Sequence, residues 1–450
     1  IMSNSNHSSQ TRQHASVFDL NGVPKFGQAL PLALQHVVAM IVGCVTPAII
    51  VSGVAGLNAR DQVILVQAAL FTSAISTLLQ LFPFIRFKNF QLGSALPVIM
   101  GISFAYVPSM QAIAASADVG TILGAQLIGG IVAIIVGLAI QKIRILFPPI
   151  ITGTVVFTIG LSLYPTAVNY MAGGTSNPDY GSWKNWLAAF FTLAVVVGLN
   201  HFAKGFLKLA SILVGIIAGY IFASFLGLVD FSGIQSAGYF QLPQPLHFGL
   251  SFDPSACIAI GVLFAINSIQ AIGDLSATPV GSMDRDPDDK ELQGGIVMYG
   301  ITNILCSLIG GLPTATYSQN VGIVTTTKVI NRCVLGLAAV IMLIAGFVPK
   351  FSALLTTIPQ CVLGGATISV FASIAMTGIK LIMLQEMNYR NTAIVGLSVA
   401  LGMGVTQAPA SLASFPAWVT TIFGSSPVVL ATLTAILLNT ILPKEEKKKK

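Results

Sequence analysis

Three side-chain amides and a carboxylate stand inside long apolar stretches, where polar groups are costly. Gln319 and Asn320 lie in residues 310–328, GGLPTATYSQNVGIVTTTK, and Asp274 lies in NSIQAIGDLSAT with Gln270 one helical turn before it. An amide both donates and accepts hydrogen bonds, which suits the edge of a heterocycle. A buried carboxylate is a candidate for cation coupling. Structural alternatives stay open: a re-entrant loop at 310–328, and Asp274 as a hydrogen-bond acceptor or an end-of-helix carboxylate.

Two further side chains could contribute to such a site. His36, in LQHVVAM, is the only histidine well inside an apolar segment, so it could relay protons or bind a neighbouring element. Phe104 lies in the stretch 94–115, which Pro97 interrupts. Its ring could stack on a planar ligand or serve only in packing.

The composition places these residues in a membrane protein. Of 450 residues, 54% are hydrophobic and 8% are charged, too few charges for the surface of a soluble protein of this length. The five cysteines are scattered without CxxC spacing, so neither a disulfide framework nor a metal site is indicated. The net charge of +7 reflects loops and a C-terminal lysine run, which indicates membrane topology rather than nucleic-acid binding.

Fourteen apolar segments are predicted, most of them near the roughly 20 residues that a helical span needs. Segments three and ten are interrupted by Pro97 and Pro313. In chain order the segments are 29–54, 61–82, 94–115, 120–140, 147–166, 185–202, 206–228, 254–275, 295–310, 312–328, 332–349, 352–379, 391–408 and 426–442.

The basic residues favour this count. Nineteen lysines and arginines fall in the N-terminus, the loops after even-numbered segments and the C-terminal tail, and three fall in the loops after odd-numbered segments. Because cytoplasmic loops carry an excess of Lys and Arg, both termini are predicted to be cytoplasmic.

Two short sequence patterns recur in the two halves of the chain. Leu96-Pro97 is echoed by Leu312-Pro313, and FPPIITG at 147–153 by IPQCVLG at 358–364. Each pair is seven segments apart, an odd number, so the halves must enter the membrane from opposite sides. We therefore predict an all-α polytopic membrane protein with a seven-plus-seven inverted repeat. Each broken segment should hold a short extended piece and then a half-helix whose N-terminal end points at a central substrate site.

The run QNVGIVTTTK at 319–328 resembles the (Q/E/P)-N-x-G-x-x-x-x-T-(R/K/G) motif of the nucleobase–ascorbate transporter family, the nucleobase:cation symporters of the second type. Gln35-His36, Ala271–Asp274 and Ile358–Gly364 also match, and the resemblance covers residues 18 to 443. Gln at the first motif position is typical of the purine and pyrimidine carriers, including the bacterial purine and xanthine–uracil permeases.

The resemblance implies a core domain that binds substrate and a gate domain that supports it and forms a homodimer. Segments one to four and eight to eleven make the core, and the rest make the gate. The implied boundaries are 1–20 for a disordered N-terminus, 21–140 and 254–350 for the core, 141–228 and 351–443 for the gate, 229–253 for an extracellular loop, and 444–450 for a basic tail.

The resemblance also implies roles for residues of the motif and of segments one and three. Gln319 would hydrogen-bond the base edge, and Asn320 would orient the site. Ser318 and Phe104 would offer backbone N–H groups. His36 matches the histidine of segment one.

Segments eight and nine depart from the family pattern at two candidate substrate contacts. Many relatives have Glu where this chain has Gln270, and xanthine-type members often have Asp where it has Tyr299. Gln270 can bind a base but cannot titrate. Asp274 and His36 therefore remain the candidates for ion coupling, either by H⁺ or by Na⁺ held at Asp274 among neighbouring oxygen atoms.

These observations predict a secondary active transporter in the cell membrane. It would import a purine base, xanthine or urate first and uracil or another nucleobase next, together with a cation and by alternating access. No catalytic residue, cofactor or nucleic-acid partner is expected. An anion exchanger or channel of the same architecture is the second alternative, although it should place a basic residue at the site, where only Lys328 is near. An enzyme would need a second acid beside Asp274.

Overall fold

The computed structural model describes residues 15–443, apart from 88–89, 144–147, 176, 232–233, 236, 417–418, 421–422 and 425. The predicted basic tail at 444–450 and most of the predicted disordered N-terminus at 1–20 lie outside the described residues. Residues from Ala15 onward are described, and they contact the start of a later helix through Asn331, whose side chain donates to the carbonyls of Asp19 and Gly22.

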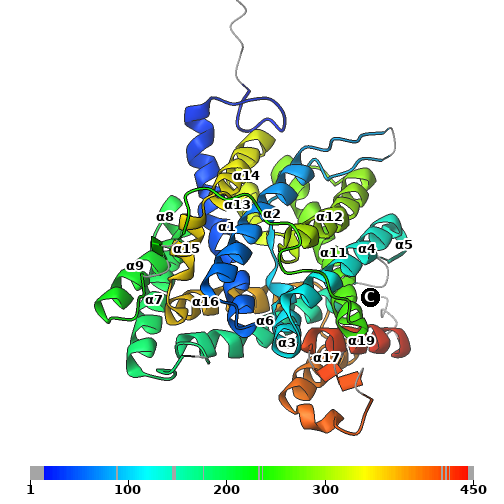
Figure 1. Ribbon diagram of the computed structural model, residues 1–450. Coiled ribbons are helices and arrows are strands. Elements are labelled where there is room, and N and C mark those ends of the chain that lie inside the picture. The colour runs from blue at the N-terminus through cyan, green and yellow to red at the C-terminus, as the bar shows by residue number, and fades with distance from the viewer. Residues whose placement is uncertain are drawn as a thin grey trace, which may run out of the picture.

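Long apolar helices dominate the structure (Figure 1). Within the described residues, eight helices are long and apolar enough to cross a membrane, or nine if one bent pair counts as a single span. The eight are α1 (Phe26–Val54), α2 (Ala59–Leu81), α4 (Val119–Leu138), α6 (Pro149–Met171), α7 (Trp183–Phe202), α11 (Pro254–Met283), α12 (Asp289–Ile309) and α16 (Gln360–Ile382). The pair is α14 (Arg332–Gly346) with α15 (Pro349–Thr356), bent by 85°.

Shorter elements complete the described chain. The short helices are α3 (Val107–Ser116), α5 (Ile140–Ile143), α8 (Phe206–Leu209), α9 (Ser211–Phe225), α13 (Ser318–Thr327), α17 (Tyr389–Gln407) and α19 (Pro427–Ile441), with 3₁₀ turns η1 (Phe104–Tyr106) and η3 (Pro409–Leu412). Two three-residue strands are present, β1 (Met100–Ile102) and β2 (Thr314–Thr316).

Two predicted segments are interrupted in the structure. In 206–228, α8 ends at Leu209 and α9 begins at Ser211; the other is 352–379. Residues 352–379 were expected to form one span, but α15 ends at Thr356 and α16 begins at Gln360. Pro359 is the N-cap of α16, and the residue before a proline is biased away from helical geometry. The sequence IPQCVLG therefore marks the start of a helix rather than the middle of one.

The helix starts follow local sequence signals. The side chains of Asn58, Asp118, Asp253 and Asn388 each accept a hydrogen bond from a backbone N–H in the first turn of the helix they precede. At α12 a capping box forms, and Arg285 pairs with its Glu291 at 2.7 Å. The hydrogen bonds to Glu291 raise the pKa of Arg285 above its ordinary value, so this loop is held by a persistent charge pair.

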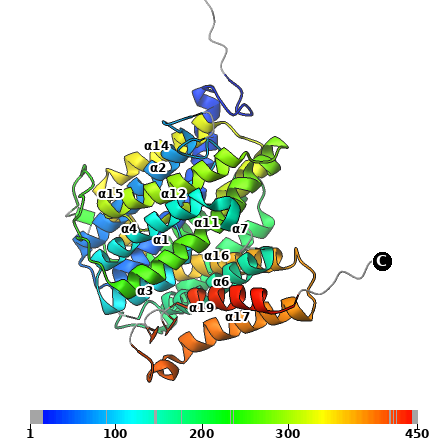
Figure 2. The same ribbon diagram turned by 90° about the vertical axis from the view of Figure 1, so that its right-hand side faces the viewer.

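The helices pack as two groups (Figures 1 and 2). The α2 group contains α1 to α4 and α11 to α15, and the α6 group contains α6, α7, α9, α16, α17 and α19. Small residues bring helices together inside each group. A Cβ at Gly130 of α4 would lie 2.8 Å from the carbonyl oxygen of Gly300 in α12, and one at Gly160 of α6 would lie 2.4 Å from the backbone of Ala375 in α16. Such close approach supplies the van der Waals contact that joins helices in lipid.

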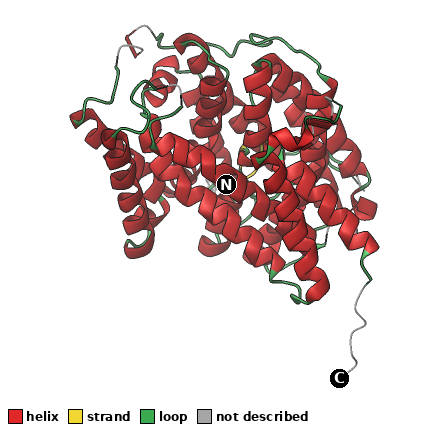
Figure 3. Cartoon of the chain, turned by 90° about the horizontal axis from the view of Figure 1, so that it is seen from below, coloured by secondary structure: helices red, strands yellow, loops and turns green. Residues whose placement is uncertain are grey.

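The two strands pair deep inside the α2 group, among helices on all sides (Figure 3). β1 and β2 run antiparallel, with Met100 opposite Thr316 and Ile102 opposite Thr314. Asn303 of α12 fixes β2, because its Oδ1 accepts the N–H of Thr314 at 2.8 Å and its Nδ2 donates to the Thr314 carbonyl at 3.1 Å. Non-helical backbone at this depth is tolerated only with such partners.

We expect Asn303→Ala to lower stability by about 1–3 kcal/mol, because the buried N–H and carbonyl of Thr314 lose their partner. Thermal unfolding of the purified protein in detergent, followed by near-ultraviolet circular dichroism, measures the shift. Thr377→Ala is the matched control, because that hydroxyl is exposed and bonds only within its own helix. Equal melting temperatures for both variants would contradict the role assigned to Asn303.

Candidate functional site

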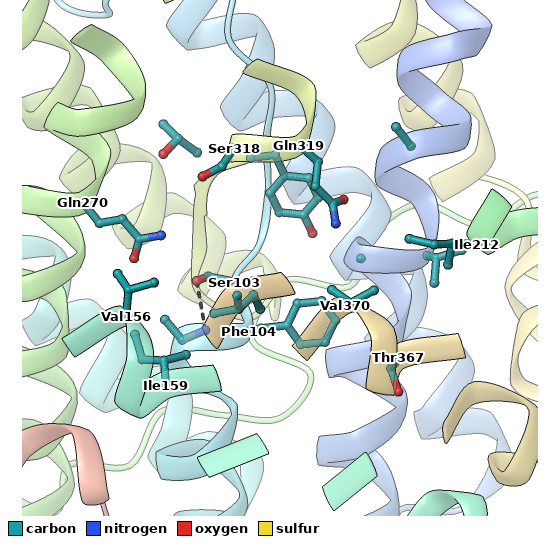
Figure 4. A pocket seen from close by; sticks show the side chains of 17 residues that line it. Ser103, Phe104, Val156, Ile159, Ile212, Gln270, Ser318, Gln319, Thr367 and Val370 are labelled. Atoms are coloured by element: carbon teal, nitrogen blue, oxygen red, sulfur yellow. Dashed lines mark hydrogen bonds between the residues drawn. The ribbon is translucent and has the colours of Figure 1, made fainter. Parts of the chain in front are cut away.

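A cavity of about 120 Å³ lies between the α2 group and the α6 group (Figure 4). This volume is well below the roughly 300 Å³ at the lower end of drug-sized pockets, so the cavity suits a small ligand. Its polar side chains come from β1–η1, α11 and β2–α13 of the α2 group: Ser103, Gln270, Thr316, Tyr317, Ser318 and Gln319.

The wall supplied by the α6 group is apolar apart from one threonine. Its residues are Val156, Ile159, Ile212, Thr367, Val370 and Ile374. The Thr367 hydroxyl donates to the Leu363 carbonyl of its own helix at 2.8 Å, so it offers no donor to the cavity in this arrangement. Polar recognition is therefore concentrated on the wall of the α2 group.

Two helix starts face the cavity. Phe104 and Ala105 of η1, which leads into α3, and Ser318 and Gln319 of α13 all line it. The first N–H groups of a helix have no partner within that helix, and the helix dipole places a partial positive charge there. The N–H of Ala105 is bound by the Ser103 hydroxyl at 3.3 Å, whereas α13 begins without a side-chain cap. The start of α13 is thus the better donor to a ligand oxygen or ring nitrogen.

Gln270 and Gln319 approach the cavity from different elements, α11 and α13 (Figure 4). Gln319 is exposed to the cavity. The Gln270 Oε1 atom is buried and has no hydrogen-bond partner among the described residues. An unpaired buried carbonyl oxygen costs about 1–3 kcal/mol, so a ligand N–H that met it would be bound favourably. The two amides can together satisfy both donors and acceptors on a planar ligand edge.

Asp274 lies behind this wall rather than in it. Thr316 Oγ1 donates to its Oδ2 at 2.5 Å, and Ser318 Oγ donates to its Oδ1 at 2.8 Å. Both hydroxyl-bearing residues line the cavity, so the carboxylate contacts the ligand space through them. Within the described residues, no group of three His, Cys, Asp or Glu side chains is placed to hold a metal ion.

His36 and Asn320 meet on the far side of α13. The Asn320 Nδ2 atom lies 3.0 Å from His36 Nδ1 and 3.3 Å from the His36 carbonyl oxygen. Both side chains are buried, and neither lines the cavity. The pair joins α13 to α1, which is a positioning contact for the residues that precede Asn320.

Tyr299 lies away from the cavity. It is buried against Phe264, with ring centroids 5.5 Å apart, and its hydroxyl pairs with that of Tyr106 in a short hydrogen bond. The structure thus brings Gln270, Gln319, Ser318 and Phe104 together, whereas it directs Tyr299 towards Tyr106 of η1 and Phe264 of α11, whose rings form its packing environment.

Tyr317 and Thr316 also line the cavity, although neither was predicted from the sequence. Tyr317 Oη donates to the Ile102 carbonyl at 2.7 Å, so its ring spans from β2–α13 to β1. The ring rests on two glycines, since a Cβ at Gly101 would lie 2.5 Å from Tyr317 Cζ and one at Gly43 would lie 3.0 Å from its hydroxyl. Their position directly before the motif was the signal that could have found them.

The apolar wall was also missed, although its spacing is regular. Val156 and Ile159 are three residues apart on α6, and Thr367, Val370 and Ile374 are three and four apart on α16. That spacing marks one helical face. In an apolar span the same spacing describes a face turned to lipid or to another helix, so only the structure identifies it as a cavity wall.

Comparison with known proteins gives a match along most of the chain. The sequence profile of the Permease family (Xan_ur_permease) matches residues 27–411. The xanthine permease of Bacillus subtilis is 34% identical over 435 residues, covering 94% of this chain and 96% of the relative. The uric acid permease PucK of Bacillus subtilis is 35% identical over 414 residues, covering 92% and 95%. The xanthine permease XanQ of Escherichia coli is 32% identical over 442 residues, covering 95% and 94%.

Solved structures share the fold at low identity. The transmembrane domain of the cyanobacterial bicarbonate transporter BicA superposes with a TM-score of 0.58 at 16% identity, over 92% of this chain and 98% of that domain. SLC26A9 gives a TM-score of 0.61 at 10% identity, over 93% of this chain and 66% of its own. At this level of identity the similarity shows a shared fold and says nothing about the ligand.

We expect Gly101→Ala to displace the Tyr317 ring and to reduce ligand binding about tenfold, which corresponds to a loss of about 1.4 kcal/mol of binding free energy. Isothermal titration calorimetry of the purified protein with a panel of small planar heterocycles tests this. Gly198→Ala is the control, because a Cβ there meets nothing within 4 Å. Unchanged affinity in Gly101→Ala would show that the packing of Tyr317 on Gly101 does not shape the cavity.

Proposed function

Because the chain belongs to the Permease family, we propose that it is a secondary active transporter that imports a purine base together with a cation. It is a multi-pass plasma membrane protein, and its relatives are permeases rather than enzymes. Xanthine or urate is the first-ranked substrate, in keeping with the names of the relatives from Bacillus subtilis and Escherichia coli. Uracil or another nucleobase is the alternative.

The observation that carries the proposal is the pair of neutral amides, Gln270 and Gln319, at one small cavity with the free start of α13 and the ring of Phe104. A purine base is planar, has N–H and carbonyl groups around its edge, and carries a π-face. Amides read the edge, backbone N–H groups bind the carbonyl oxygens, and an aromatic ring contacts the face. An apolar wall opposite completes the enclosure.

The residues of the same site favour a nucleobase carrier over an anion exchanger. The fold is shared with BicA and SLC26A9, and helix starts do attract anions. However, the described residues that line the cavity include no Lys, Arg or His, whereas they do include two amides suited to a heterocycle. The site therefore fits an uncharged polar ligand better than a small inorganic anion.

The proposed architecture has fourteen spans in a seven-plus-seven inverted repeat, with both termini cytoplasmic. The antiparallel pairing of β1 with β2 supports it, because equivalent strands of inverted halves run in opposite directions. In this proposal the core domain (21–140 and 254–350) corresponds to the α2 group and the gate domain (141–228 and 351–443) to the α6 group, through which a homodimer forms. Helix α15, which packs against α2, crosses the boundary at residue 350. Alternating access is movement of one group against the other around the cavity between them.

The proposed coupling residue is Asp274. Its two oxygens receive hydroxyl bonds from Thr316 and Ser318, which also line the cavity, so a change in its charge alters the groups next to the ligand. Either a proton or Na⁺, a hard cation that prefers oxygen ligands, could neutralise it there. One charge that crosses 100 mV releases about 2.3 kcal/mol, enough for roughly 50-fold accumulation of a base. His36 binds Asn320 and so holds α13, the helix that begins with Ser318, on the side away from the cavity.

We expect Gln319→Ala to weaken xanthine uptake by roughly 5- to 150-fold. The variant leaves a polar group of the bound base without a hydrogen-bond partner, which costs about 1–3 kcal/mol. Uptake of radiolabelled xanthine into proteoliposomes measures it, with a panel of purines and pyrimidines as competitors. Gln28→Ala, an exposed glutamine in the first turn of α1, is the control. Wild-type uptake by Gln319→Ala would remove Gln319 from the site, and no competition by any base in the wild type would overturn the substrate class.

We expect Asp274→Asn to abolish accumulation above equilibrium while base exchange between loaded and external pools continues. The amide has nearly the size of the carboxylate but carries no charge, so it cannot bind and release the coupling cation. Concentrative uptake under separate Na⁺ and H⁺ gradients, with counterflow alongside, distinguishes the two activities. Asp284→Asn, an exposed residue after α11, is the control. Full gradient-driven accumulation by Asp274→Asn would place coupling elsewhere.

A further inference from the structure

A second cavity, of about 360 Å³, lies next to the amide-lined cavity along α1. Helices α9 and α15 supply its remaining walls, together with Ile358 and Leu363 at the start of α16. Val42 of α1 borders both this cavity and the amide-lined one, so the two spaces share a wall. The second cavity thus occupies the seam where the α2 group meets α9 of the α6 group.

The walls of this cavity are almost wholly aliphatic and aromatic. Of the two hydroxyl groups present, that of Tyr220 is bound to Thr357 Oγ1 at 2.8 Å, and that of Thr46 is buried without a hydrogen-bond partner among the described residues. A cavity without convergent polar groups does not hold water. Ile217 and Leu354 line it and are 50% and 42% exposed, so the cavity opens at the outer surface of the apolar helices, where lipid chains lie.

Basic residues stand at one end of the same seam. Lys204 and Lys208 are exposed in the sequence AKGFLKLA, which joins α7 to α9 and contains no acidic residue. α8, which carries Lys208, packs against α1. The exposed Phe206 and Leu207 lie between the two lysines, a combination typical of a segment at the membrane–water interface.

The distance between the lysines and the cavity fits a lipid tail. Leu213 lines the cavity and follows Lys208 by only five residues, across the break between α8 and α9 at Ala210. From Leu213 to Tyr220 the cavity wall extends for about 10 Å along α9. An acyl chain on this wall stays within one leaflet of the hydrocarbon core, about 15 Å thick, with the two lysines ahead of it in the chain.

We propose that this seam binds an anionic phospholipid of the leaflet on the side of Lys204 and Lys208. The headgroup lies at the two lysines, and one acyl chain runs along α9 into the aliphatic cavity between α1 and α15. A lipid chain fills a space that neither water nor side chains fill, and it keeps a deformable surface where the two helix groups move past each other. The lipid is then a ligand of the transporter separate from the transported base.

Native mass spectrometry of the full chain tests the proposal without any substrate. The protein is purified in detergent with phosphatidylglycerol or with phosphatidylcholine of the same acyl chains, and the fraction carrying one lipid is measured. We expect phosphatidylglycerol to be retained at least about tenfold more than phosphatidylcholine, because two lysines attract its charge. Retention should fall to the phosphatidylcholine level in Lys204→Gln/Lys208→Gln, with Lys184→Gln, an exposed lysine at the start of α7, as the control.

A second pair of variants tests the acyl chain. Ile217→Trp places a bulky ring at the cavity mouth and should also abolish retention, whereas Ile221→Trp, one turn along α9, 53% exposed and outside the cavity lining, should retain the lipid as the wild type does. Size-exclusion profiles identify any variant that fails to fold. Equal retention of the two lipids, or wild-type retention in Ile217→Trp, would overturn the proposal. Neither result would bear on purine uptake, which is measured separately.

Discussion

The pairing of β1 with β2 is the constraint on which the rest of the structure depends. Two stretches of chain leave helical geometry deep inside the α2 group, and their backbone groups cannot be left without partners there. Each strand supplies hydrogen-bond partners for part of the backbone of the other. The side chains of Thr77 and Asn303 accept hydrogen bonds from the remaining N–H groups of Met100 and Thr314. Because the strands are fixed, the helices that follow them begin at defined places, and both beginnings face one cavity.

The short helix α13 then concentrates several functions. Ser318 and Gln319 at its start face the cavity, Asn320 binds His36 of α1, and Lys328 at its end donates to the Gly281 carbonyl of α11. A ligand that contacts the start of α13 therefore acts on an element already joined to two long helices and, through Ser318, to Asp274. In the proposed mechanism, binding of the base and neutralisation of the Asp274 carboxylate would act on the same helix, α13, which is a physical requirement for coupling two solutes.

The sequence was informative at residues whose polar side chains are costly to place in an apolar segment. Amides and a carboxylate in apolar stretches indicated Gln270, Gln319 and Asp274, and the structure places the first two at the cavity and the third directly behind it. The family was predicted from the motif and is confirmed. Tyr299 could not be placed, because substitution of a family acid does not show which way the new ring turns. The apolar wall could not be found either, since residues facing lipid and residues facing a cavity have the same composition in an apolar helix.

Helix α1 borders two neighbouring spaces of opposite character. Ala39, Val42 and Gly43 form part of the wall of the amide-lined cavity, and Val42 also lines the aliphatic cavity. A polar ligand enters the first cavity favourably only when the hydrogen bonds it made with water are replaced there, whereas an acyl chain has no hydrogen bonds to replace in the second. Because one helix contributes to both walls, a displacement of α1 against α9 would alter both spaces. With a lipid in the seam, as we propose, the cavity for the transported base is linked to the bilayer through α1.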